Sequence, residues 1–152
     1  MSTGDAPKLN HLTSIPLGGP PLRPVPIAGT TLDGQALTLN PLEGTRPTVL
    51  LFLGGHCDGC DALADLLDGA GLPEGVEVVG IVPGEDHPKG GGLEAFADRR
   101  ASVLRAPGAF ADYRVPAPPF YVIVLPREGV VAAEGVPLGA SDVVSRVNEL
   151  LA

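Results

Sequence analysis

The chain has 152 residues, a length typical of one domain with its own hydrophobic core. Hydrophobic residues make up 44%, which indicates a folded protein, and the net charge of −8 excludes nucleic-acid binders that need a basic stripe. No apolar run approaches the roughly 20 residues that span a bilayer. Residues 1–10 lack the apolar core of a signal peptide, so we expect a cytoplasmic protein without a membrane span.

Prolines crowd the start of the chain. Proline has no backbone donor, so this stretch cannot form a regular helix or an inner strand. We predict an extended, proline-rich arm over residues 1–26 and a single domain over residues 27–152. The prolines of the arm are Pro7, Pro16, Pro20, Pro21, Pro24 and Pro26.

The first half of the domain predicts a hairpin followed by a β-α-β unit. Residues 27–40 contain two β-prone runs around the Asp33-Gly34 turn signal. Residues 47–53 and 76–82 are nearly continuous apolar runs, as expected of strands buried on both faces. Residues 61–67 between them have helical spacing, so the two strands should be parallel.

The second half alternates short helices and strands. After a glycine-rich loop at 83–92, we predict a helix at 93–100, a short strand at 102–104, a helical turn at 108–113, strands at 120–125 and 130–133, and a last helix for which Ser141 is the N-cap. The last two strands are joined by a tight turn and must be antiparallel. The fold class is therefore α/β, a mixed sheet flanked by helices on both faces.

The two cysteines of the chain, Cys57 and Cys60, form a C-x-x-C immediately after the first buried strand and a Gly-Gly turn. This order places Cys57 at the N-terminus of a helix, where unpaired N–H groups favour a thiolate. Cys60 then lies one turn along the same face. A mixed disulfide at Cys57 could be resolved by Cys60, which is the arrangement that disulfide exchange needs.

Neighbouring charges modify this picture. Asp58 and Asp61 oppose a thiolate at Cys57, and the helix terminus favours it by a comparable amount. We therefore expect the pKa of Cys57 to be only modestly lowered and the pair to behave as a reductant. His56 could stabilise the thiolate or move protons, or it could simply face solvent.

These residues resemble the thioredoxin superfamily, and within it the TlpA-like branch with its redoxin domain. The resemblance covers about residues 27–152 and rests on the hairpin with Leu32-Asp33-Gly34, the strand, the C-x-x-C with its helix, and the segment Tyr113-Arg-Val-Pro-Ala-Pro-Pro-Phe-Tyr-Val-Ile-Val. That segment is also similar to one in disulfide proteins of methylamine utilisation. Proteins of this kind often carry a membrane anchor or an export signal; residues 1–152 show neither pattern, so we do not expect an export-linked role.

The resemblance implies a thioredoxin-like fold and a cis-proline loop that faces the disulfide and offers backbone groups to the substrate. By spacing from Tyr113, Pro119 is the cis residue, and Pro118 and Phe120 complete the substrate-binding segment. An ordinary loop is the alternative. Three departures from the family are His56 in place of tryptophan, Asp58-Gly59 between the cysteines, and a strand before the motif without an acid. The proton acceptor for Cys60 must come from elsewhere, with His56 and Glu85 as candidates.

Three rival functions remain at this stage. In a peroxiredoxin-like peroxidase, Cys60 would align with the peroxidatic cysteine, but Cys57 and Leu53 stand where the motif has threonine and proline. A copper or zinc chaperone could use both cysteines with His56 or His87. A redox-inactive binding module is the third possibility. Residues 85–89 follow a strand end near the expected active edge and either shape a partner surface or form a solvated loop.

We predict a thiol-disulfide oxidoreductase with Cys57 as nucleophile, Cys60 as resolving thiol, His56 beside them and Pro119 positioning the substrate. The expected partners are a protein or small-molecule disulfide and a thiol reductant. No cofactor and no metal are required, because electrons move through the cysteine pair.

Overall fold

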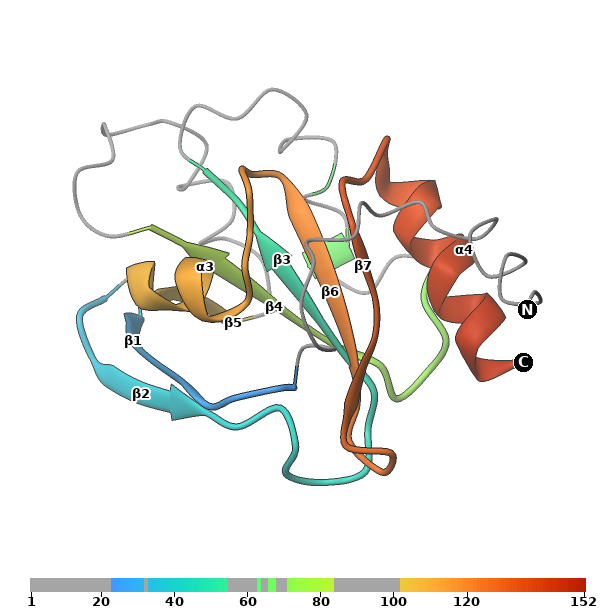
Figure 1. Ribbon diagram of the computed structural model, residues 1–152, viewed down its shortest axis with the longest axis horizontal. Coiled ribbons are helices and arrows are strands. Elements are labelled where there is room, and N and C mark those ends of the chain that lie inside the picture. Colours follow the sequence, from blue (N-terminus) through green and yellow to red (C-terminus); the bar gives the residue numbers. More distant parts are fainter. Residues whose placement is uncertain (1–22, 32, 55–62, 64–65, 68–70, 84–101) are drawn as a thin grey trace, which may run out of the picture.

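The computed structural model describes residues 23–31, 33–54, 63, 66–67, 71–83 and 102–152. Its centre is a sheet of seven strands in the order β2-β1-β5-β4-β3-β6-β7 (Figure 1). The predicted mixed α/β architecture is confirmed. The strands are β1 (Ile27–Thr31), β2 (Ala36–Leu39), β3 (Thr48–Phe52), β4 (Glu77–Val82), β5 (Ser102–Arg105), β6 (Phe120–Leu125) and β7 (Val130–Gly135).

The strand directions follow the connections. β3, β4 and β5 are parallel, with Val49 beside Val78 and Gly80 beside Val103. β6 runs antiparallel to β3, and β7 runs antiparallel to β6. The hairpin of β1 and β2 joins the sheet through two residue pairs between β1 and β5, in antiparallel sense. The parallel first pair and the antiparallel last pair are as predicted.

The hairpin turn forms where the sequence places it. Gly34 has a φ of +97°, the left-handed region that glycine adopts at little cost. Its N–H donates to the carbonyl of Thr31, and the Thr31 hydroxyl donates to the Asp33 carboxylate. The Asp-Gly pair therefore sets the register of β1 against β2.

The core lies on both faces of β3, β4 and β6. Every residue of β3 is buried, because its apolar run has helices or strands on all sides. Alternate residues of the run enter two clusters, one containing Leu51 and Leu53 and the other containing Leu50 and Phe52. We call these the α4 face and the α3 face, after the helix that covers each.

Helix α4 (Ala140–Leu151) covers the first of these faces, and Val143 and Val147 are its buried residues. Leu63, Leu66 and Leu67, from the segment predicted as a helix, are buried in the same cluster. Helix α3 (Pro107–Asp112) covers the opposite face (Figure 1). The predicted helix at 93–100 lies outside the described residues.

The predicted N-cap of the last helix is wrong. Gly139 precedes α4, and Ser141 lies inside its first turn with no capping hydrogen bond. The neighbouring Asp142 supplies the polar contact instead, since its Oδ2 accepts the N–H of Leu138 at 3.1 Å. A carboxylate in the first turn also interacts favourably with the helix dipole, which explains why Asp142 takes this part.

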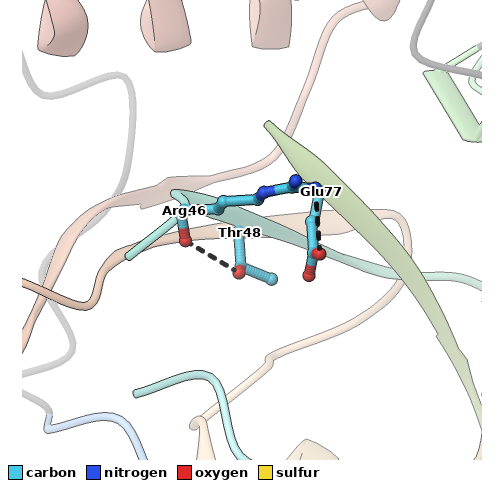
Figure 2. Close-up of polar contacts among 3 residues, drawn as sticks. All are labelled: Arg46, Thr48 and Glu77. Atoms are coloured by element: carbon cyan, nitrogen blue, oxygen red, sulfur yellow. Dashed lines mark hydrogen bonds and ion pairs between the residues drawn. The ribbon is translucent and has the colours of Figure 1, made fainter. Parts of the chain in front are cut away.

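The amino ends of β3 and β4 carry a small polar cluster (Figure 2). The Arg46 Nη1 lies 3.7 Å from the Glu77 Oε2, and the Thr48 hydroxyl donates to the carbonyl of Arg46 at 3.4 Å. Both charged side chains are more than half exposed, so the ion pair contributes little to stability. This end of the sheet is structural and lies opposite the carboxyl ends of the parallel strands.

The end of the predicted arm contacts the domain. The Val25 N–H donates to the Tyr113 hydroxyl at 2.8 Å, and that hydroxyl donates to the Val25 carbonyl at 2.6 Å. Pro24 is buried, so residues 24–26 lead directly into β1. Residues 1–22 lie outside the described part, and the boundary at residue 26 stays a prediction. Neither described helix has the length and apolar content that crossing a membrane requires.

Candidate functional site

The Pro118–Pro119 peptide bond is cis, as predicted from the resemblance. It immediately precedes β6, whose first residue, Phe120, pairs with Phe52, the last residue of β3. The prolyl loop, residues 114–119, therefore lies at the end of the sheet where β3 finishes. Leu53 continues along β4 through a 2.8 Å hydrogen bond to the Ile81 carbonyl, and Cys57 follows Gly54 three residues later in the sequence.

A regular helix terminus sets the start of the prolyl loop. At the end of α3, the Val115 N–H donates to the Phe110 carbonyl at 2.8 Å and the Arg114 N–H donates to the Ala111 carbonyl at 3.1 Å. This pair of bonds is the Schellman motif, with Arg114 at the left-handed position. Val115 and Phe110 both pack against the α3-face cluster, which is the apolar contact that accompanies the motif.

Aromatic side chains of the α3 face pack against both ends of the prolyl loop. The Phe52 ring meets Phe110 edge to face, with centroids 5.1 Å apart, and lies 5.9 Å from the Tyr113 ring. Phe120 belongs to the same buried cluster. Packing of this kind restricts the rotamers of the rings and so fixes the start of the loop, at Tyr113, and its end, at Phe120.

The predicted site residues divide into two groups. Pro118 is exposed and Pro119 is half-buried, so both reach the surface, whereas the Phe120 side chain is 4% exposed and packs in the core. A contact of Phe120 with substrate therefore involves its backbone or the exposed rim of its ring. His56, Cys57, Cys60, Glu85 and His87 lie outside the described residues, and their roles stay predictions.

Two charged residues that sequence reasoning missed lie near the loop. Glu134 on β7 is partly buried, and desolvation raises the pKa of its carboxyl group, while the charge of Arg114 lowers it. Among the described residues, the Glu134 Oε1 is a buried oxygen without a hydrogen-bond partner. The acid in the otherwise apolar run Val-Val-Ala-Ala-Glu-Gly was the available signal. Nothing in the sequence indicated that Arg114 would lie near it.

Exposed apolar side chains continue the surface beside the loop. Gly135 pairs with Tyr121, so Val136 comes next to the start of β6. Val136 is 45% exposed and Leu138 is 94% exposed. Val136 and the exposed Pro116, Ala117 and Pro118 flank the start of β6, and Leu138 follows Val136 by two residues.

Other candidate sites are weaker. No group of three or more histidine, cysteine or acidic residues that could hold a metal occurs within the described ranges, which exclude His56, Cys57 and Cys60. A shallow cavity of about 290 Å³ lies at the opposite end of the sheet, between Pro47, Leu125 and Leu150. It is remote from the prolyl loop, and its polar lining residues are Thr45, Arg127 and Glu128.

Comparison with known proteins supports the fold. No protein-family model matches the sequence, and no curated protein matches it. Solved structures do match. The thioredoxin domain of a thiol-disulfide oxidoreductase from Bacteroides vulgatus superimposes with a TM-score of 0.67 at 18% identity, covering 91% of this chain and 100% of that domain.

Two further neighbours agree. A thioredoxin-family thiol:disulfide interchange protein from Chlorobium tepidum has a TM-score of 0.66 at 18% identity and covers 89% of this chain and 99% of its own. A secreted disulfide oxidoreductase from Mycobacterium tuberculosis has a TM-score of 0.60 at 24% identity. The match covers 80% of this chain and 94% of that protein's chain. The chain therefore has a thioredoxin-like fold, and these structural neighbours are thiol-disulfide oxidoreductases.

Proposed function

We propose that the chain is a thiol-disulfide oxidoreductase that exchanges a Cys57–Cys60 dithiol with a disulfide in a protein or small molecule. The observation that carries the proposal is the cis Pro118–Pro119 loop beside the end of β3, the strand that leads to the C-x-x-C. The thioredoxin-like fold and the activities of its structural neighbours support it.

The reaction proceeds in two thiol-disulfide exchanges. The Cys57 thiolate attacks one sulfur of the substrate disulfide, a mixed disulfide forms, and the other substrate sulfur leaves as a thiolate that takes up a proton. The Cys60 thiolate then attacks the Cys57 sulfur and releases the second substrate thiol. The substrate gains two electrons, the cysteine pair becomes a disulfide, and a thiol reductant restores the dithiol.

The surface beside the loop favours a protein substrate over a small one. Val136 and Leu138 expose apolar area next to the prolyl loop, where an extended peptide on either side of a disulfide could bury it. The exposed backbone of an extended segment could pair with the loop in the manner of an added strand. A cytoplasmic location stays a prediction.

The direct test uses single-cysteine variants. The wild type should reduce the disulfides of insulin with dithiothreitol as electron donor, and Cys57→Ser should abolish turnover. Cys60→Ala should accumulate a mixed disulfide at Cys57, detectable by mass spectrometry as the added mass of a peptide substrate. Retention of turnover in Cys57→Ser would refute the proposal. Consumption of hydrogen peroxide without insulin reduction would favour the peroxidase instead.

A further inference from the structure

A β-bulge determines which way Glu134 points. Ile123 pairs with Ala133 and Val124 with Val131, so Ala132 is an extra residue on β7. The extra residue resets the alternation of side chains. Glu134 consequently pairs with Val122 and shares the α3 face with it, two positions along the strand pair from the start of β6 at Phe120.

This location puts a carboxyl group on the α3 face, two positions from the residue at which the prolyl loop enters β6. The Oε1 of Glu134 is buried without a hydrogen-bond partner among the described residues, a costly state for an ionised group. Desolvation raises the pKa of the carboxyl group, and the positive charge of Arg114 opposes that effect. β6 presents the apolar Val122 to it, and β7 forms the edge of the sheet.

Arg114 occupies a backbone position that favours glycine. Its φ is +56°, and it is the one non-glycine residue with a positive φ in the described ranges. A left-handed residue with a side chain is strained, and the Schellman position is usually glycine for that reason. Strain is retained at the first residue of the prolyl loop, and its guanidinium charge acts on the partly buried Glu134, which points to a role for that group.

We infer that Glu134 is a positioning residue for disulfide exchange, acting through Arg114 to hold the 114–119 loop where it receives the substrate. The inference rests on the proposed function of the cysteine pair. Ionised Glu134 attracts the guanidinium group and fixes the start of the loop. Protonated Glu134 loses that attraction, so the loop samples more conformations and binds substrate less tightly.

The test separates binding from chemistry. Reduced protein is mixed in a stopped-flow instrument with a synthetic peptide that carries one intramolecular disulfide, from pH 4 to pH 8. In the wild type, the half-saturating peptide concentration should fall as pH rises through the pKa of Glu134. Glu134→Gln should keep a high half-saturating peptide concentration at every pH, about fivefold above that of the wild type at neutral pH. Its limiting rate should equal that of the wild type.

Two further variants distinguish positioning from general damage. Glu128→Gln removes an exposed acid in the β6–β7 turn at the far end of the sheet and should behave as the wild type. Arg114→Gly should weaken peptide binding as Glu134→Gln does. The double variant should bind the peptide no more weakly than either single variant, because Glu134 acts through Arg114. Superimposable profiles for Glu134→Gln and the wild type, or additive losses in the double variant, would overturn the inference.

A second measurement does not depend on turnover. The backbone amide resonances of Val115 and Ala117 should shift with pH in the wild type and stay constant in Glu134→Gln. Absence of this titration in the wild type overturns the positioning role. If the resonances titrate but wild-type protein does not reduce the peptide, the proposed function has failed, and the role in exchange falls with it.

Discussion

The two faces of the sheet bury different kinds of side chain. The α4 face is almost wholly aliphatic, with Tyr121 as its one aromatic member among the described residues. The α3 face collects aromatic side chains and polar groups, among them the Tyr113 hydroxyl and the Glu134 carboxyl. Its aromatic members are Phe52, Phe110, Tyr113 and Phe120.

The difference shows how the prolyl loop is held. Aliphatic side chains, as on the α4 face, pack densely and specify little beyond shape. On the α3 face, the Tyr113 hydroxyl fixes the chain that enters β1, and packed aromatic rings fix both ends of the prolyl loop. The prolyl loop is therefore anchored from the α3 face, whereas the segment after the C-x-x-C packs on the α4 face through Leu63, Leu66 and Leu67.

The largest expected effect comes from Phe52 and Leu51, neighbours on β3 that point to opposite faces. Phe52→Ala should lower the free energy of unfolding by about 3–5 kcal/mol and Leu51→Ala by about 2–5 kcal/mol. Urea denaturation measures both. Only Phe52→Ala should also shift the ring proton resonances of Tyr113 in NMR spectra, because Phe52 contacts the Tyr113 ring. Equal spectral changes in both variants would contradict the division between the faces.

Two glycines, one on each face of the sheet, give the next test. A Cβ on Gly29 would lie 2.5 Å from the Arg105 carbonyl oxygen, a backbone atom that cannot turn away. Gly29→Ala should therefore destabilise the protein by about 1–3 kcal/mol through overpacking between β1 and β5. At Gly80 the nearest atom is a Val103 methyl at 3.4 Å, on the α4 face. Gly80→Ala is the matched control, and thermal unfolding should show a much smaller change.

The smallest expected effect is that of Tyr113→Phe, which removes the two hydrogen bonds to Val25. The loss should be about 1–2 kcal/mol, and the Val25 amide should exchange with solvent faster. Burial raises the pKa of Tyr113 above its ordinary value of 10.0, with a smaller contribution from Asp112. The wild type should therefore lose stability as pH rises above that value, since the folded state resists ionisation.

Tyr113→Phe should lack this alkaline loss. Denaturant titrations at pH 8 and above pH 10 measure it. Parallel pH dependences in the two proteins would show that the Tyr113 hydroxyl is not the buried group responsible.

Sequence reasoning recovered most of the fold because its strongest signals are local. The apolar runs predicted β3, β4 and β6, and Asp33-Gly34 predicted the hairpin turn. The attachment of the hairpin to β5 was not predicted, since it depends on two residue pairs with no sequence signature. The end of β7 was also missed, because a bulge interrupts the alternation by which strands are read.

Those parts of the candidate site that belong to a recognisable motif were predicted, and the others were missed. Pro118-Pro119 is recognised by its spacing before a strand. Arg114 and Glu134 lie 20 residues apart in the sequence, and the charge of Arg114 acts on Glu134 only because the chain folds back through β6 and β7. Ser141 shows the opposite error. It is a favoured N-cap residue by type, but the helix begins one residue earlier and Asp142 makes the polar contact.

The reduction potential of the Cys57–Cys60 pair tests the central claim most directly. The protein is equilibrated with glutathione buffers of defined ratio, and the free thiols are counted at each. We expect a reversible two-electron couple between about −120 and −300 mV, toward the reducing end because acidic residues flank the pair. A pair that forms no disulfide at any glutathione ratio would contradict it.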